Sequence, residues 1–298
     1  MSAARTSSTG RVLGRGERRS DIKGTLFQAA LLLSVAVGLI TLTVLLVQVV
    51  IDGAPRLNQN LIFHFPSGNP ELAGAQSAIM GTIWIIGIVA ATCIPIGVGA
   101  AIYLEEYADE DRWYNRAIEI NIQNLAAVPS IVYGILGLAF LVRGFGNLGQ
   151  VVLAGGLTLS LLVLPIVILS AREAIRAVPS SIRQGSLALG ATKWQTIRHQ
   201  VLPASIPGIA TGTILALSRA IGEAAPLVLL GALTFITFNP DGLNSAFTVL
   251  PIQIFNWISR PQEEFKVLAA AAIVILLALL LAMNSVAIFL RNRYQRKW

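Results

Sequence analysis

Two opposite charges lie close together inside one of the apolar stretches of the chain. Arg219 and Glu223 occur four residues apart in the segment 206–232, which holds no other charged residue. On a helix this spacing places both side chains on one face. A charge in the hydrocarbon layer of a membrane costs about 2.5–3.5 kcal/mol on insertion scales, so such residues face a partner or a water-filled cavity.

An arginine in this position suits an anion, because its planar fork donates two parallel hydrogen bonds. We expect Arg219 to line a translocation path and to contact an anion briefly. Glu223 would hold the arginine and partly neutralise it, so that the anion is released again. The alternative interpretation is a structural ion pair that locks two helices together.

The rest of the sequence shows no constellation typical of an enzyme. His64 and His199 fall in different predicted loops, and Cys93 lies in an apolar stretch, where we expect a small buried hydrophobe. There is no metal-ligand spacing, no nucleophile–base pair and no glycine-rich phosphate loop. We therefore expect no catalytic residue, no metal site and no cofactor bound by this chain.

Membrane-spanning helices are the elements that must position Arg219 and Glu223. Hydrophobic residues make up 55% of the 298 residues and charged residues 12%, whereas soluble domains carry about a quarter charged residues. Apolar runs of about 18 residues or more can cross the hydrocarbon layer as helices. We predict an all-α polytopic membrane protein with six transmembrane helices, at 25–51, 77–104, 117–142, 149–171, 206–232 and 266–290.

Two features interrupt these apolar runs. Polar residues from Glu119 to Asn124 crowd the start of the third span, so we expect that stretch to lie at the membrane interface. Four spans contain a proline, which frees a backbone carbonyl and is expected to kink the helix. These prolines are Pro95, Pro129, Pro165 and Pro226.

The distribution of basic residues predicts the orientation. Lysine and arginine are concentrated in the tail 1–24, the segments 104–116 and 172–205, and the tail 291–298. The positive-inside rule places these regions, and therefore both termini, in the cytoplasm. Topology thus explains the basic tail without a nucleic-acid partner. An acidic run, Glu105, Glu106, Asp109, Glu110 and Asp111, is expected to be a solvated cap or a contact with a partner.

The segment 172–205 is longer than a bare connection between two spans requires. Ser181 with Gln184 fits a capping box, which predicts a short helix at about 182–189. Gly190 stands where a left-handed helix stop is expected.

A second capping box, Thr192 with Gln195, predicts a helix that runs to about Val201 and ends before Pro203. The first of these two short helices exposes Leu187, Ala188 and Leu189. We interpret the pair as a docking surface for a partner protein. An amphipathic loop on the lipid surface explains the pattern equally well.

This segment resembles the cytoplasmic loop of bacterial ABC importer permeases. Their pattern is E-A-A, three residues, G, nine residues, then I-x-L-P. Gly190 and Leu202–Pro203 match it, whereas Gln184–Gly185–Ser186 replaces the triplet and Gln200 the isoleucine. The resemblance implies that this loop seats a coupling helix on an ATPase subunit. That role is assigned to Ser181, Ile182, Arg183, Gln184, Gly185, Ser186, Leu187, Ala188, Leu189 and Gly190.

Three further segments resemble the PstA-type phosphate permeases. They are PSGNPELAGAQSAIMGTIW at 66–84, VPSIVYGILGL at 128–138 and LSRAIGEAAPLVLLG at 217–231. The resemblance implies the type I (MetI-like) permease fold, in the bacterial inner membrane, with phosphate as the anion that meets Arg219. It also suggests a gating role for Ser130 and Tyr133. Other solutes such as sulfate or molybdate, or a membrane sensor or scaffold that carries nothing, stay open as alternatives.

The resemblance also implies partners. They are a PstC-type sister permease, two PstB-type ATPase subunits that bind ATP and Mg, and an extracellular PstS-type phosphate-binding protein. Because ATP is hydrolysed on the ATPase subunits, the chain itself is expected not to be an enzyme. The permease domain is expected at 25–290, within the lipid bilayer.

The predicted orientation can be tested by labelling. We predict that Lys193→Cys does not react with a membrane-impermeant maleimide in intact cells but reacts after permeabilisation, because 172–205 faces the cytoplasm. Ser67→Cys, in the predicted external loop 52–76, is the control that reacts in both. Labelling of Lys193→Cys from outside would invert the orientation and exclude the transporter interpretation.

Overall fold

The computed structural model describes residues 22–109, 111–144, 146–232 and 235–294. Every regular element in these ranges is a helix. The chain divides into two compact units, 1–48 and 49–298. The predicted basic tail up to residue 21, Glu110 and the last four residues lie outside the described ranges.

In the described part of the first half of the chain there are six α-helices, one 3₁₀ turn and two π-helical turns. The α-helices are α1 (Ile22–Gly53), α2 (Gln59–Phe63), α3 (Gln76–Ile102), α4 (Trp113–Ala126), α5 (Ser130–Leu136) and α6 (Val152–Arg176). A 3₁₀ turn, η1, spans Ala54–Arg56, and π-helical turns extend α3 and α5 as η2 (Tyr103–Tyr107) and η3 (Gly137–Val142).

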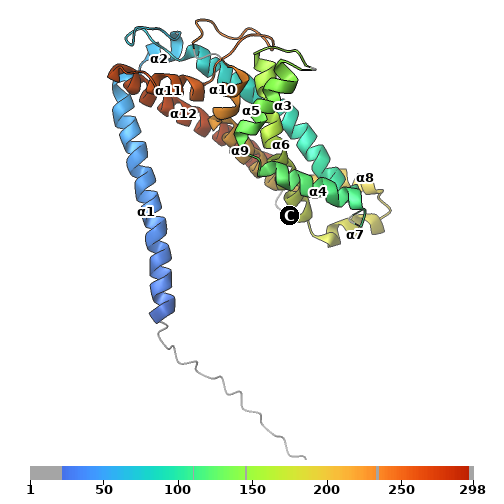
Figure 1. Cartoon of the computed structure of the whole chain (residues 1–298). Coiled ribbons are helices and arrows are strands. Elements are labelled where there is room, and N and C mark those ends of the chain that lie inside the picture. The colour runs from blue at the N-terminus through green and yellow to red at the C-terminus, as the bar shows by residue number, and fades with distance from the viewer. Residues whose placement is uncertain (1–21, 110, 145, 233–234, 295–298) are drawn as a thin grey trace, which may run out of the picture. The chain divides into compact units, whose positions relative to one another are not determined.

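The second half contains six more α-helices. They are α7 (Ser180–Ala188), α8 (Lys193–Thr196), α9 (Leu202–Gly222), α10 (Ala225–Leu230), α11 (Leu250–Ile258) and α12 (Glu263–Tyr294). A π-helical turn, η4 (Ile197–Val201), joins α8 to α9. Within the second unit, α7 and α8 lie with α4 at one end of the bundle, and α2 and α11 lie at the other (Figure 1).

The predicted spans correspond to helices long and apolar enough to cross a membrane. In the described part of the chain there are five such helices, or six if a bent pair counts as one span. They cover Gly24–Arg56, Gln76–Tyr107, the bent pair Trp113–Ala126 and Ser130–Val142, Val152–Arg176, Lys193–Gly222 and Glu263–Arg293. The all-α polytopic fold is thus confirmed, while two of the spans differ in detail from the prediction.

The third span is broken instead of continuous. α4 and α5 are bent by 105° relative to each other at residues 127–129. Pro129, the N-cap of α5, disfavours helical backbone at the residue before it. The Tyr133 hydroxyl donates a hydrogen bond to the carbonyl of Leu125 over 2.8 Å, and so ties the two helices together across the break. The polar stretch that starts this span is therefore a separate helix, α4.

The prediction of one continuous helix over 206–232 is wrong. α9 ends at Gly222, Glu223 has extended backbone, and α10 begins two residues later. Pro226 belongs to the first turn of α10, where its missing N–H costs nothing, so it does not kink a helix interior. Pro95 and Pro165, by contrast, lie inside α3 and α6, which continue through them.

The predicted helix end before Pro203 is also wrong. Helical backbone continues from Lys193 through η4 and Pro203 into α9. A π-helical turn is a register adjustment within a helix, and η4 lies directly before the proline. The second short helix of the segment 172–205 is thereby the start of the fifth span.

The core forms where α6 packs between α3 and α9. Val89 and Cys93 of α3, Leu159 and Val163 of α6, and Ala216 of α9 are buried there together. Small residues allow the close approach: a Cβ on Gly156 would lie 2.6 Å from the Ile88 side chain. Cys93 is buried, as predicted.

A second close approach joins the two broken spans, because α5 packs on α10. A Cβ on Gly134 would lie 2.7 Å from the Cα of Pro226 and 2.8 Å from its carbonyl oxygen. Backbone atoms cannot move aside as a flexible side chain does. Gly134 therefore sets how near the break before α5 lies to the break before α10.

We predict that Gly134→Ala destabilises the protein by about 1–3 kcal/mol, the usual cost of overpacking. Gly87→Ala is the matched control, because a Cβ on Gly87 of α3 meets nothing within 4 Å and alanine favours a helix over glycine by about 1 kcal/mol. Thermal unfolding in detergent compares the two. Equal midpoints would mean that α5 and α10 do not pack as described.

Candidate functional site

Arg219 and Glu223 form the ion pair that their spacing predicts. The Nε of Arg219 donates to Oε1 of Glu223 over 3.3 Å. Side-chain exposure is 46% for the arginine and 18% for the glutamate. The pair does not lie in mid-helix as predicted: Arg219 belongs to the last turn of α9, and Glu223 is the residue at which the helix ends.

Tyr133 lies near this pair. It is buried on α5, and the charge of Arg219 acts on its phenol group. Ser130 is the first residue of the same helix and is partly buried. The structure thus brings Tyr133, Arg219 and Glu223 together, whereas Ser130 is linked to them only through its position on α5.

Residues at both helix breaks near the pair are exposed. Gly222 and Ala225 flank the break after α9 and are exposed, as are Ala127 and Pro129 at the break before α5. At membrane depth, non-helical backbone is tolerated only where it is buried in protein or lines a water-filled cavity. Residues that are exposed in the single chain therefore require a wet path or a partner protein at this site.

The inner side of Glu223 faces α3. A cavity of about 10 Å³ is lined by Glu223 together with Thr82, Ile85 and Ile86 of α3, among others. That volume is the smallest that holds one water molecule, and an anion such as phosphate does not fit. In this conformation, α3 forms a packed wall beside the glutamate.

The segment around Gly190 has a helix on either side of the glycine, as the sequence predicts, but the second one continues into α9 and the predicted cap of the first is different. The capping box of Thr192 with Gln195 is present, and Gly190 has a φ of +85°. The capping box of Ser181 with Gln184 is wrong, because α7 starts two residues earlier than predicted, at Ser180, with Pro179 as its N-cap and no side-chain cap. The fixed φ of proline suits this position next to a helix start.

α7 presents most of the predicted docking residues on its surface. Leu187 and Leu189 are exposed, the latter by 90%. A hollow of about 520 Å³ lies between α7 and the helices after it. It is lined by Ser181, Ile182, Gly185, Ser186 and Leu189, with Ala191, Gln195, His199 and Gln200 opposite. Ser186 and Thr196 hold the two sides together through a 2.9 Å hydrogen bond between their hydroxyls.

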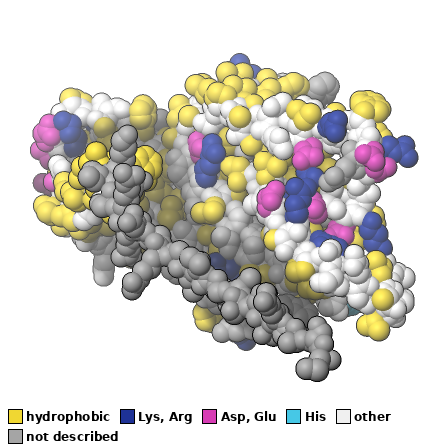
Figure 2. All heavy atoms as spheres, turned by 90° about the horizontal axis from the view of Figure 1, so that it is seen from below, with side chains coloured by type: hydrophobic (Ala, Val, Ile, Leu, Met, Phe, Trp, Pro, Cys, Tyr) yellow, Lys and Arg dark blue, Asp and Glu magenta, His cyan; other side chains and the backbone are white. Residues whose placement is uncertain are grey.

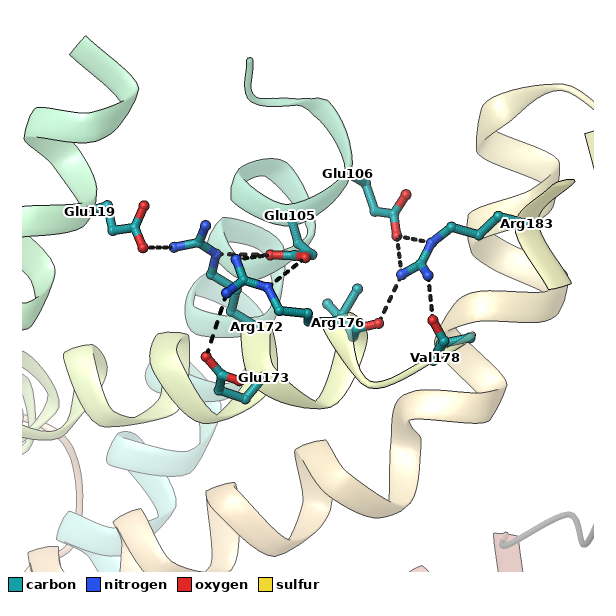
Figure 3. A network of polar contacts seen from close by, with 9 residues as sticks. Glu105, Glu106, Glu119, Arg172, Glu173, Arg176, Val178 and Arg183 are labelled. Atoms are coloured by element: carbon teal, nitrogen blue, oxygen red, sulfur yellow. Dashed lines mark hydrogen bonds and ion pairs between the residues drawn. The ribbon is translucent and has the colours of Figure 1, made fainter. Parts of the chain in front are cut away.

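The acidic run that follows α3 is not simply a solvated cap. Glu105 accepts hydrogen bonds from the Nε of Arg172 at 2.9 Å and from the Nε of Arg176 at 3.0 Å. Arg172 also pairs with Glu119 of α4 at 2.5 Å. With only 7% of its side chain exposed, Arg172 is nearly enclosed by carboxylates (Figure 3).

Glu106 points away from Glu105, toward α7 (Figure 3). Its Oε1 accepts from Arg183, with the nearest nitrogen 2.9 Å away. Arg183 donates in addition to the backbone carbonyls of Ile175, at 2.8 Å, and Val178, at 2.5 Å. We call the six side chains Glu105, Glu106, Glu119, Arg172, Arg176 and Arg183 the ion-pair network.

Sequence reasoning missed this network because its partners lie far apart in the chain. Glu105 is separated by 67 residues from Arg172 and by 71 from Arg176. One signal was available: acidic and basic residues both gather at the ends of predicted spans that face the same side of the membrane. Figure 2 shows acidic and basic side chains side by side on one face of the molecule, among hydrophobic ones.

Within the described ranges, no group of three His, Cys, Asp or Glu side chains is placed to hold a metal ion. The described site residues are an arginine–glutamate pair at a helix end and an exposed face on α7.

Comparison with known proteins agrees with this arrangement. Residues 93–296 match the family "Binding-protein-dependent transport system inner membrane component". The chain belongs to this family and is a permease subunit of an ABC importer. As such it is an inner-membrane component and not an enzyme, and ATP hydrolysis takes place on a partner ATPase.

Among its relatives is the phosphate transport system permease protein PstA of Haemophilus influenzae, with 31% identity over 89% of this chain and 91% of the relative. PstA of Yersinia pestis is 32% identical over 89% of this chain and 90% of its own. The probable ABC transporter permease protein YqgI of Bacillus subtilis is 32% identical, covering 80% of this chain and 77% of the relative.

Solved structures confirm the type I fold at low sequence identity. A chain of a bacterial ABC transporter that imports the acidic polysaccharide alginate aligns with a TM-score of 0.64, at 18% identity, covering 93% of this chain and 99% of that one. The methionine transporter MetNI, in an inward-facing conformation, gives 0.58 at 17% identity, covering 75% and 95%.

The ion-pair network should contribute measurably to stability. We predict that Glu105→Gln lowers the free energy of unfolding by about 3 kcal/mol, because removing one member of a nearly buried ion pair leaves charge without full compensation. Asp109→Asn is the matched control: its pair with Arg112 is more than half exposed, and such pairs contribute about 0–1 kcal/mol. Similar unfolding midpoints for both variants would contradict a structural role for the network.

Proposed function

We propose that this chain carries inorganic phosphate into the cell as a subunit of an ATP-driven importer, and that Arg219 contacts the anion on its way. The PstA proteins among the relatives, similar over about nine tenths of their length, support phosphate as the cargo. The observation that carries the proposal is an arginine held at an exposed helix break inside a membrane domain.

The geometry suits transient anion binding. Only the Nε of Arg219 bonds to Glu223. Within the described part of the chain, its two terminal nitrogens have no partner, and they are available to donate parallel hydrogen bonds to phosphate oxygens. Glu223 offsets part of the positive charge, which limits affinity. Passage requires binding that is weak enough for release.

The exposed residues at the two breaks support a path at the surface of this chain that is completed by a second one. A PstC-type sister permease would cover residues 127–129 and 222–225 and supply the opposite wall. Tyr133 is buried on α5 and bonds across the break at residues 127–129, and Ser130, on the same helix, is the further candidate for gating contacts. Non-helical backbone would then line a wet cavity, as the physics of the bilayer requires.

The exposed face of α7 and the hollow beside it support a contact with ATPase subunits in the cytoplasm. Two PstB-type subunits would bind ATP and Mg, and an extracellular PstS-type protein would deliver phosphate. Among the alternatives to phosphate, sulfate or molybdate would use the same Arg219 fork, so direct competition experiments separate them. A sensor or scaffold would show no ATP-dependent uptake at all.

We predict that Arg219→Gln lowers uptake of labelled phosphate at least about tenfold in a transporter that assembles normally, since a charge-assisted hydrogen bond is worth about 1.5–3 kcal/mol. Reconstituted vesicles with ATP inside measure the uptake, and an excess of unlabelled sulfate or molybdate tests the choice of anion. Arg143→Gln, at an exposed arginine outside the site, is the matched control and should transport normally.

Unchanged uptake by Arg219→Gln would remove the arginine from the mechanism and leave the structural ion pair as its role. No uptake of labelled phosphate by the wild type, together with ATP-dependent uptake of labelled sulfate, would keep the importer and change its cargo.

A further inference from the structure

We infer that η2, the π-helical turn that ends α3, is the positioning element through which movement of α7 reaches the part of α3 that packs beside Glu223. This inference rests on the proposed function, because it takes α7 as the contact with the ATPase. It concerns residues outside the loop pattern that the family shares.

Consecutive residues of η2 hold both short helices of the segment around Gly190. Glu106 pairs with Arg183 of α7, and only 9% and 22% of these two side chains are exposed. The next residue, Tyr107, lies under Lys193 of α8, with 5.0 Å between the ammonium nitrogen and the ring centroid. A cation over an aromatic face is attracted to it. η2 therefore contacts the segment on both sides of its central turn.

Glu105, the residue directly before Glu106, fixes η2 to the membrane domain. Glu105 bonds to Arg172 and Arg176 on α6, so Glu105, Glu106 and Tyr107 reach three different helices. A π-helical turn is wider than an α-helical one, and such turns are frequent at functional sites because they re-aim side chains. η2 is thus a junction of α3, α6, α7 and α8.

The other end of α3 lies beside Glu223. Thr82, Ile85 and Ile86 line the small cavity with the glutamate, about 30 Å along the helix from Glu106 at 1.5 Å per residue. α3 is continuous over this distance and closely packed on α6. Packed helices shift as units between discrete arrangements instead of deforming gradually. A displacement of η2 therefore changes the wall against which Glu223 packs.

A second connection allows the role of η2 to be tested separately. Arg183 also donates to the carbonyls of Ile175 and Val178, and so holds α7 on the end of α6 independently of Glu106. Removing the Glu106 carboxylate removes the polar contact of α7 with η2, while these two bonds and the apolar packing of Ile182 near the end of α3 stay. A loss of function in that variant is then a loss of the connection to α3 and not of α7 itself.

The experiment uses the full importer in proteoliposomes, with its ATPase subunits, sister permease and binding protein. Glu106→Ala and Tyr107→Leu remove the two contacts, singly and together. Tyr103→Leu is the matched control, because Tyr103 is an exposed tyrosine of the same turn. We expect the double variant to hydrolyse ATP within about twofold of the wild-type rate and to import about tenfold less solute per ATP, the range of an ordinary coupling free energy.

Unchanged import per ATP in the double variant would overturn the inference. A proportional loss of hydrolysis and import would also overturn it, because that pattern marks a purely structural role. If the double variant does not assemble, the solute imported per ATP is compared between Tyr107→Leu and Tyr103→Leu, and the same outcomes decide. Solute import per ATP is measured with whichever solute the wild type imports. Wild-type import of another anion would therefore refute phosphate as the cargo and leave the test of η2 intact.

Discussion

Every peptide group at membrane depth needs a hydrogen-bond partner, and this requirement determines where the chain is helical and where it is not. Most of the spans satisfy it within a single helix. At the two exceptions, residues 127–129 and 223–224, the N–H groups of Ala127, Val128 and Glu223 still donate to carbonyls of the preceding turn. The remaining peptide groups need water or a polar partner. The two breaks are also neighbours, because α5 packs on α10 with Gly134 against Pro226. A single water-exposed surface shared by the two helix breaks explains why they lie close together.

The position of Glu223 at a helix end changes what its pair with Arg219 can do. Four residues apart inside a helix, two side chains are held on one face by the backbone between them. Here the backbone becomes extended at Glu223, so its φ and ψ are not fixed by helical hydrogen bonds on both sides. A pair of this kind suits a site that must bind and release an anion.

Short sequence patterns correctly predicted the features that depend only on neighbouring residues. The apolar runs located the membrane helices, Gly190 marked a left-handed stop, and Thr192 with Gln195 marked a helix start. Where a neighbouring residue competes, the local signal failed: Pro179 starts α7 one residue before Ser181 could cap it. The continuation through Pro203 and the break after Gly222 depend on how α9 packs, which periodicity alone does not reveal.

The ion-pair network could not be predicted in the same way, because its geometry is set by the packing of α3 on α6. Its existence still has a physical rationale. Replacing nearly buried ion pairs by apolar side chains is often neutral or stabilising, so stability alone does not explain three carboxylates and three arginines here. Charged pairs do, however, have a preferred partner and direction, which apolar contacts lack. Arg183 uses this property twice, on Glu106 and on the carbonyls of Ile175 and Val178 at the end of α6. The network thereby fixes the register of α7 against two helices whose own sequences do not specify it. In this chain the E-A-A triplet of the family's loop is replaced by Gln184, Gly185 and Ser186, and the network supplies charged contacts from outside that triplet.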